Sequence, residues 1–216
     1  MYKRQLFLPS TNCEFIDRFL VTAEAYRIPV TLLLNKCDLY ATDALQNAQT
    51  EFLKIYRSAG YEVIELSATQ QTGIDAFKKM LPGKTSLLSG NSGVGKSTLI
   101  RAIDPSLDIR IGAVSASSSK GKHTTTFSEM YPLAGGGYLI DTPGIKGFGL
   151  IDIENDEICR YFPDLFRYAP LCGYYNCTHT HEPACAVREA LRAGEIGLSR
   201  YESYLKLLDD DQKYRK

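Results

Sequence analysis

The sequence predicts an α/β protein with a doubly wound sheet, followed by a small α-helical module that binds a metal ion. Three observations support this fold class. Short apolar runs alternate with amphipathic segments along most of the chain. A glycine-rich loop follows one of these runs, and three cysteines and two histidines crowd together near the C-terminal end. The 216 residues, of which 44% are hydrophobic, suffice for one ordinary core and a smaller appendage.

The charge balance and the length of the apolar runs exclude some functional classes. The chain carries 25 basic and 25 acidic side chains, so it lacks the overall basic excess typical of nucleic-acid binders, although a local basic patch would fit this balance. No apolar run reaches the roughly 18 residues of a membrane span, and the apolar stretch after Gln5 is too short for a secretory signal. We therefore expect a cytoplasmic protein that does not enter a membrane.

The predicted elements alternate in type from the N-terminal end onward. Thr11 to Glu14 fit a capping box, which predicts a helix at about residues 12–27. Further helices are predicted at 43–58, at 73–80 and after the glycine-rich loop, and strands at 30–34, 61–66, 85–89, 127–133 and 137–140.

The alternation stops after the last of these strands, which predicts a domain boundary near 148–152. We expect an α/β domain over residues 1–149 and a smaller domain over residues 150–216. Helices in the smaller domain are predicted at about 185–193 and from residue 199 onward.

A phosphate-binding loop is predicted between the strand at 85–89 and the helix that follows it. The loop matches G-x-x-x-x-G-K-[ST], and its expected nucleotide contacts are Gly90, Asn91, Ser92, Gly93, Val94, Gly95, Lys96, Ser97 and Thr98. Glycines let backbone N–H groups converge on a phosphate at the helix N-terminus. Lys96 would carry a charge to the β- and γ-phosphates as a catalytic residue, and Ser97 would bind Mg²⁺. The alternative is a ligand-free glycine turn, which the flanking strand and helix disfavour; the loop does not specify the base.

Guanine is the predicted base, because an N-K-x-D motif follows the strand at 30–34. Its residues are Asn35, Lys36, Cys37 and Asp38. The Asp38 carboxylate can accept hydrogen bonds from N1–H and the 2-amino group of guanine, a donor pair that adenine lacks. Asn35 would brace the neighbouring loop, and Lys36 would lay its alkyl stem over the base.

A third segment, Ser67-Ala68, follows the strand at 61–66 and would place the Ala68 N–H near the guanine O6. By itself this dipeptide is equally compatible with an ordinary strand-to-helix turn. Together with the other two motifs, it predicts a site that rejects adenine, because the wrong base would leave buried polar groups unpaired.

Two switch segments are predicted around the γ-phosphate. Asp141 to Gly144 match D-x-x-G, in which Asp141 holds Mg²⁺ through water and the Gly144 N–H senses the γ-phosphate. Upstream, three threonines offer hydroxyls for Mg²⁺: Thr124, Thr125 and Thr126.

The attacking water needs a partner other than the glutamine found in many GTPases, because Ile145 stands at that position. His123, beside the threonines, is the candidate catalytic residue that positions or polarises this water. The alternative is a solvated loop histidine.

A closed zinc site is predicted in the smaller domain. Three thiols and one imidazole make the ligand set of a structural zinc ion: Cys172, Cys177, His179 and Cys185. His181 could replace His179, but only one imidazole is needed, and we favour His179. The alternative, free cysteines in a small core, is disfavoured because so short and polar a segment buries little surface.

The order of the motifs differs from that of ordinary small GTPases, which begin with the phosphate loop. Here the guanine motif comes first, so the order is circularly permuted. The permutation places the second switch directly before the smaller domain, so the nucleotide state could move the zinc module.

This order, the phosphate loop, the run Gly121 to Thr126 and the cysteine–histidine cluster resemble the ribosome small subunit-dependent GTPase A (RsgA) family over nearly the whole chain. The resemblance implies a circularly permuted P-loop NTPase that binds GTP, Mg²⁺ and Zn²⁺. It also implies slow GTP hydrolysis stimulated by the small (30S) ribosomal subunit, a role in late maturation of that subunit, and rRNA contacts by the domains that flank the GTPase. By motif position, Thr125 is the best candidate for the threonine that senses Mg²⁺.

The N-terminal end departs from the family pattern. Members carry an OB-fold RNA-binding domain and a further GTPase strand ahead of the helix that begins here at Thr11, and we expect neither in this sequence. Residues 1–8 resemble a truncated or altered beginning, which agrees with the lack of net positive charge. We expect a monomer. The alternatives are a permuted GTPase with a different protein target and an inert fragment that holds GTP without hydrolysing it.

Overall fold

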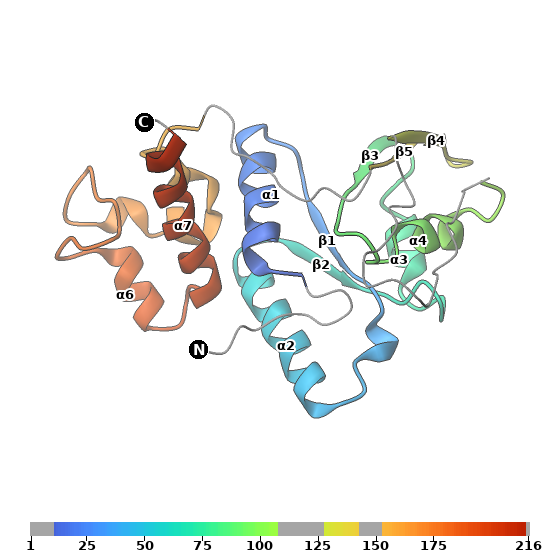
Figure 1. Ribbon diagram of the computed structural model, residues 1–216, viewed down its shortest axis with the longest axis horizontal. Coiled ribbons are helices and arrows are strands. Elements are labelled where there is room, and N and C mark those ends of the chain that lie inside the picture. The colour runs from blue at the N-terminus through green and yellow to red at the C-terminus, as the bar shows by residue number, and fades with distance from the viewer. Residues whose placement is uncertain (1–10, 108–127, 143–152, 215–216) are drawn as a thin grey trace.

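The computed structural model describes residues 11–107, 128–142 and 153–214, with side chains described up to residue 209. The described elements follow the predicted order (Figure 1). They are α1 (Cys13–Ala25), β1 (Thr31–Leu34), η1 (Cys37–Leu39), α2 (Asp43–Ser58), β2 (Glu62–Glu65), α3 (Ile74–Lys78), β3 (Lys84–Leu88), α4 (Lys96–Ile103), β4 (Glu129–Pro132), β5 (Gly137–Asp141), η2 (Ile158–Tyr161), α5 (Pro163–Phe166), η3 (Ala169–Leu171), α6 (Ala186–Arg192) and α7 (Leu198–Tyr214).

The predicted α/β alternation is confirmed, and the elements that the sequence did not predict are short. The helices labelled η are 3₁₀ turns of three or four residues, too short to show a hydrophobic period. The start of α1 differs slightly from the predicted capping box. Asn12 rather than Thr11 is the N-cap, and its side chain accepts a hydrogen bond of 3.2 Å from the Glu14 N–H.

The described strands form two hydrogen-bonded sheets instead of one continuous sheet (Figure 1). β1 pairs with β2 in parallel, and β3 pairs with β5 in parallel. β4 is antiparallel to β5, because the turn before Gly137 is too short for the crossover that a parallel pair requires. Gly137 has a φ of +88°, and a Cβ there would lie 2.3 Å from the Lys84 carbonyl oxygen, so this turn requires glycine.

Buried side chains form three clusters. One lies between β1, β2, α1 and α2, and a second packs β3 and β5 against α3 and α4. The third fills the C-terminal part of the chain and includes Val21 of α1, whereas the neighbouring Leu20 belongs to the first cluster. The helix α1 therefore has one face on the α/β part and the other beside α7 (Figure 1).

The predicted domain boundary at 148–152 lies outside the described residues. No helix among the described residues has the length and apolarity needed to cross a membrane.

Candidate nucleotide and metal sites

The guanine motif and the phosphate loop meet at the carboxyl ends of β1 and β3. Asn35 directly follows β1, and its side-chain Nδ2 donates a 2.9 Å hydrogen bond to the carbonyl oxygen of Val94 in the phosphate loop. Its Oδ1 accepts a hydrogen bond of 3.1 Å from the Ala68 N–H. One amide group therefore connects the three predicted nucleotide-binding segments.

Lys36 lies along the phosphate loop. Its backbone is left-handed, with a φ of +65°, and its Nζ donates a 2.7 Å hydrogen bond to the Gly93 carbonyl oxygen. Partial burial lowers the pKa of Lys36, while the nearby Asp38 opposes this effect. The next residue, Cys37, donates its N–H to the Leu66 carbonyl oxygen at 3.2 Å, which ties the motif to the end of β2. Asp38 is exposed within η1, so its carboxylate is accessible to a base.

The phosphate loop needs its glycines for two reasons. Gly93 and Gly95 have φ values of +82° and +95°, which L side chains rarely adopt. A Cβ on Gly95 would also lie 2.5 Å from the Asn35 Nδ2, so this position requires glycine for space as well. The chain then enters α4, and the Leu99 N–H donates to the Gly95 carbonyl oxygen at 2.9 Å.

Lys96 reaches back over its own loop. Its Nζ donates to the carbonyl oxygens of Gly90 at 2.8 Å and Asn91 at 3.4 Å. Burial lowers the pKa of Lys96, and the carboxylate of Asp141 opposes this shift. Asp141 is buried at the end of β5, beside the start of α4, and Thr142 donates its hydroxyl to the Leu88 carbonyl oxygen at 3.1 Å. Lys96 and Ser97 at the start of α4 and Asp141 at the end of β5 thus lie at one edge, where β3 and β5 end.

Some of the remaining residues predicted to contact the nucleotide lie within the described ranges, and others lie outside them. Ser67 and Ala68 are buried after β2, and Ser92 and Thr98 are exposed. His123, Gly144, Ile145 and the threonines 124–126 lie outside the described residues.

Three thiols and one imidazole come together in the C-terminal part of the chain. The ligand atoms of Cys172, Cys177, His179 and Cys185 all lie within 4.8 Å of one another. The Cys172 Sγ is 3.6 Å from the His179 Nδ1 and 3.9 Å from the Cys185 Sγ, and the latter lies 3.5 Å from the His179 Nδ1.

These separations fit a tetrahedral zinc ion. Zinc bonds of about 2.3 Å to sulfur and about 2.0–2.1 Å to nitrogen place tetrahedral ligands about 3.6 to 3.8 Å apart. The three cysteines form no disulfide, and burial raises the pKa of the Cys177 and Cys185 thiols. Without a cation these thiols are protonated at neutral pH, so metal binding would release protons.

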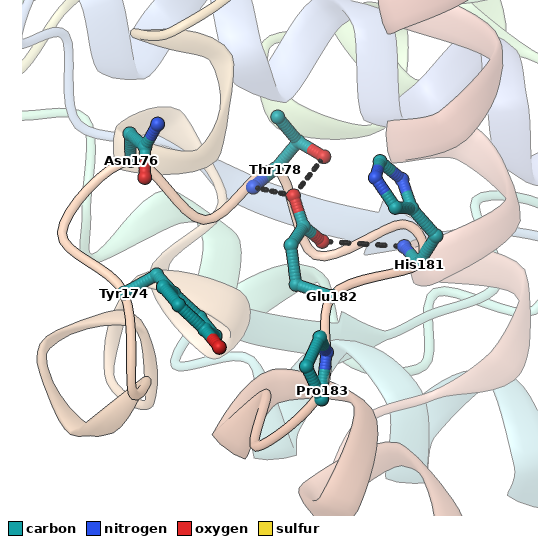
Figure 2. Close-up of a pocket in the computed structure, with 6 residues that line it drawn as sticks. All are labelled: Tyr174, Asn176, Thr178, His181, Glu182 and Pro183. Carbon is teal, nitrogen blue, oxygen red and sulfur yellow. Dashed lines mark hydrogen bonds between the residues drawn. The ribbon is translucent and has the colours of Figure 1, made fainter.

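Tyrosines of α7 and a carboxylate hold the loop that carries His179. The Tyr201 hydroxyl donates to the His179 carbonyl oxygen at 2.6 Å, and the Tyr204 hydroxyl donates to the Thr178 carbonyl oxygen at 2.8 Å. Figure 2 shows the Glu182 carboxylate accepting hydrogen bonds from Thr178 and from the His181 N–H. Sequence analysis predicted the helix from residue 199 onward but did not reveal these contacts.

His181 does not belong to this group of four. Its Nδ1 lies 2.8 Å from the Thr180 hydroxyl, and its side chain borders a hollow outside the cluster (Figure 2). The hollow is lined by Tyr174, Asn176, Thr178, His181, Glu182 and Pro183. None of these residues belongs to the group of four, so the hollow is distinct from the metal cluster.

A buried ion network, which sequence analysis missed, joins α1 to α7 and α5. The Arg200 guanidinium is fully buried and contacts Asp17 at 2.7 Å and Asp164 at 2.9 Å. Tyr56 of α2 donates its hydroxyl to the same Asp17 carboxylate at 3.0 Å. Because 183 residues separate Asp17 from Arg200, no local pattern could have predicted their pairing.

The chain is similar to one family over most of its length. The RsgA GTPase family model matches residues 6–151. The small ribosomal subunit biogenesis GTPase RsgA 2 of Bacteroides thetaiotaomicron is 53% identical over 209 residues, which cover 96% of this chain and 67% of that protein. A Phocaeicola vulgatus protein, small ribosomal subunit biogenesis GTPase RsgA, has the same identity and coverage.

Solved structures agree with these sequence similarities. YjeQ from Thermotoga maritima is 38% identical with a TM-score of 0.77, over 94% of this chain and 66% of that one. YloQ, described as a circularly permuted GTPase, is 29% identical with a TM-score of 0.75, over 96% of this chain and 65% of that one. The chain thus spans about two-thirds of the length of the relatives that it matches.

Proposed function

This chain belongs to the RsgA GTPase family, and on that premise we propose that it binds GTP, hydrolyses it and acts in late maturation of the small ribosomal subunit. The fold is that of a circularly permuted P-loop NTPase, as the similarity to YloQ indicates. Its named relatives are small ribosomal subunit biogenesis GTPases, and the proposed partner is accordingly the small subunit with its rRNA.

The bridging amide of Asn35 carries the nucleotide-binding proposal. This side chain hydrogen-bonds both to Val94 of the phosphate loop and to the Ala68 N–H, so the base-recognition and phosphate-recognition segments share one edge. Because its donor and its acceptor each have a partner, this partly buried amide joins the two segments. A nucleotide whose base lies at Asp38 and whose phosphates lie at Lys96 fits this arrangement.

Each residue of the site has a proposed role. The Asp38 carboxylate accepts from the guanine N1–H and 2-amino group, and the stem of Lys36 covers the base. Lys96 exchanges its loop carbonyls for phosphate oxygens, and the backbone N–H groups from Asn91 to Thr98 cradle the phosphates. Ser97 and, through water, Asp141 would hold Mg²⁺, which neutralises charge on the phosphates.

The remaining catalytic roles rest on the sequence. We propose that Thr125 binds Mg²⁺, that the Gly144 N–H senses the γ-phosphate and that His123 positions the attacking water. His123→Ala should abolish subunit-stimulated hydrolysis while leaving GTP binding intact. Unchanged stimulated hydrolysis would contradict the role of His123 without affecting the binding proposal.

We further propose that Cys172, Cys177, His179 and Cys185 bind a structural zinc ion. The tetrahedral spacing supports this proposal, and the four protein ligands leave no open position for catalysis. Zinc would therefore fix the fold inside the C-terminal domain, which we propose to span residues 150–216 after a GTPase domain at 1–149.

Base recognition can be tested by changing Asp38 alone. Asp38→Asn should lower GTP affinity roughly 10- to 100-fold, because it removes charged hydrogen bonds to the base. The same variant should bind xanthosine triphosphate better than the wild type does, since an amide can donate to the xanthine 2-oxo group. Calorimetry with GTP, ATP and xanthosine triphosphate measures this change in base preference. The matched control is Asp43→Asn, which removes an exposed carboxylate on α2. ATP bound as tightly as GTP would refute the assignment.

The ribosomal role can be tested by co-sedimentation with purified small subunits in GTP, GDP and a non-hydrolysable analogue. We expect nucleotide-dependent binding, steep salt dependence if rRNA is contacted, and faster GTP hydrolysis when subunits are added. Binding without salt dependence would favour a protein target, and GTP binding without any hydrolysis would favour an inert GTP-binding module. Light scattering of the free protein would test the proposed monomer.

A further inference from the structure

The Asp38 carboxylate, the proposed contact to guanine, takes its direction from a short backbone turn. Asp38 is exposed in the middle of η1, and among the described residues no group donates a hydrogen bond to its carboxylate. The turn has only three residues, and Lys36 at its N-cap provides no side-chain hydrogen bond. Whatever fixes the backbone of η1 therefore also aims the carboxylate.

Cys37, the first residue of η1, ties this turn to two strand ends. Its N–H donates to the Leu66 carbonyl oxygen at 3.2 Å, beyond β2, and its thiol donates to the Leu34 carbonyl oxygen at 3.1 Å, in β1. Its own carbonyl oxygen accepts a 3.2 Å hydrogen bond from the Tyr40 N–H. Burial raises the pKa of the Cys37 thiol, so the thiol stays protonated at neutral pH and keeps its hydrogen to donate.

The side-chain amide of Gln49, on α2, supports the same cysteine. Its Nε2 lies 3.9 Å from the Cys37 Sγ and donates a 2.6 Å hydrogen bond to Glu65 Oε2. A carboxamide nitrogen carries two N–H groups, so one can serve the sulfur while the other serves the carboxylate. The other carboxylate oxygen of Glu65 accepts from Arg57 at 3.0 Å. Glu65 is therefore held from both sides and in turn fixes the amide.

Gln49 stands at the end of the helix face that packs on the sheet. Phe52 and Tyr56 of α2 are buried in one cluster with Leu34 of β1 and Val63 of β2. Gln49 precedes Phe52 by three residues and so shares its face of the helix. Because α2 follows β1 along the chain, its first turns lie at the carboxyl ends of the strands, beside the guanine motif.

We propose that Gln49 is a positioning residue for guanine recognition. Its amide holds Cys37, Cys37 holds η1, and η1 aims the Asp38 carboxylate at the N1–H and 2-amino group of the base. Two parallel hydrogen bonds require the carboxylate to align with the edge of the base, so a small rotation of η1 weakens them unequally. The inference rests on the proposed binding of GTP and adds a selectivity residue outside the N-K-x-D motif.

Gln49→Met tests this role, because methionine keeps the side-chain length and helix propensity but removes both N–H groups. The variant should bind GTP about threefold to tenfold more weakly, as expected for the loss of one hydrogen bond. Inosine triphosphate lacks the 2-amino group and should lose less affinity, so the preference for GTP over inosine triphosphate should narrow. Calorimetric titration measures both affinities. Gln46→Met makes the same change at an exposed position of α2 and should leave the preference unchanged.

Substitutions of Cys37 separate positioning from a general loss of stability. Cys37→Ala should narrow the preference as Gln49→Met does, and the double variant should narrow it no further. Cys37→Ser should keep more of the preference than Cys37→Ala, because a hydroxyl still donates to Leu34 and accepts from Gln49. Additive effects of the two single changes would overturn the proposal, and so would equal preferences in Cys37→Ser and Cys37→Ala. The Cys37 comparison decides the matter if Gln49→Met does not fold.

The wild-type protein distinguishes failure of this inference from failure of the proposed function. Equal affinities of the wild type for GTP and inosine triphosphate would refute the base assignment at Asp38, and the role of Gln49 with it. A wild-type preference for GTP that persists unchanged in Gln49→Met would overturn the role of Gln49 alone, even if the variant melts at a lower temperature.

Discussion

Two regions of the molecule differ in the contacts that stabilise them. The nucleotide edge lies at the carboxyl ends of β1 and β3, and the C-terminal module is the part of the chain from residue 153 onward. At the nucleotide edge, Asn35, Lys36 and Lys96 donate hydrogen bonds to carbonyl oxygens of loops, and all three side chains are only partly buried. In the C-terminal module, a fully buried guanidinium contacts two carboxylates, and the ligand atoms of three cysteines and one histidine lie within 4.8 Å of one another.

The two regions should therefore respond differently to substitution. The lysines of the nucleotide edge can exchange loop carbonyls for phosphate oxygens at little cost, because their present partners also accept hydrogen bonds from water. Arg200 and its two carboxylate partners are buried away from water, so removing one of them leaves an unpaired buried charge. We therefore expect changes in the module to affect folding, and changes at the nucleotide edge to affect ligand binding.

The buried Arg200 is the charge on which the contact between α1 and α7 depends. Burial by itself would lower its pKa, but the carboxylates of Asp17 and Asp164 outweigh burial and raise it. Phe162 adds a cation–π contact, with its ring centroid 4.6 Å from the guanidinium carbon. The network fixes which face of α1 meets the module.

The largest expected effect is the loss of the proposed zinc ion. His179→Ala should lower the melting temperature by roughly 10 °C or more, because metal binding supplies folding energy to a small domain. His181→Ala is the matched control, since His181 is not one of the four clustered residues, and should leave both zinc content and melting temperature unchanged. Differential scanning calorimetry with metal analysis measures both. Loss of zinc from the His181 variant alone would reverse the ligand assignment.

The next largest effect is expected at the buried ion network. Arg200→Ala should lower the free energy of unfolding by about 3–5 kcal/mol, because Asp17 and Asp164 would remain buried without their cation. Arg160→Ala removes an exposed arginine that pairs with Glu157 at 3.6 Å, and should change stability by less than about 1 kcal/mol. Urea unfolding of both variants compares the two. Similar losses would mean that Arg200 is not energetically distinct from a surface arginine.

At the nucleotide edge, two glycines separate backbone strain from steric conflict. Gly93→Ala should weaken GTP binding about tenfold, because only its left-handed backbone is penalised. Gly95→Ala should weaken binding about 100-fold, because its Cβ would also displace the Asn35 amide. Calorimetric titration measures both affinities, with thermal unfolding to show that each variant folds. Equal effects would indicate that the Asn35 side chain can move away from the new Cβ without weakening GTP binding.

The smallest effect is expected for the surface pair between α1 and α7. Lys206 contacts Glu14 at 2.7 Å and is 57% exposed. Lys206→Ala should lower the free energy of unfolding by about 0.2–1 kcal/mol, and this difference should shrink as salt is added. Urea unfolding at low and high salt measures it. A loss as large as that for Arg200→Ala would contradict the contrast between exposed and buried pairs.

Local sequence patterns determined the order and type of the main elements. Three patterns can be recognised within a few consecutive residues: apolar runs of strand length, the glycine-rich loop before α4 and the cysteine–histidine cluster. Each can be recognised because a strand, a phosphate loop and a zinc site are built from residues that are close in sequence. The nucleotide and metal roles of these residues stay predictions, and the structure places the Asn35 amide against the phosphate loop and His179 among three thiols.

Only the tertiary structure decided which distant groups meet. The bridge from Asn35 to Val94, the pairing of Asp17 with Arg200 and the hydrogen bonds from Tyr201 and Tyr204 to the loop that carries His179 join residues far apart in sequence. Such contacts arise from the packing of whole helices and strands, and a hydrophobic period records which face is buried but not its partner.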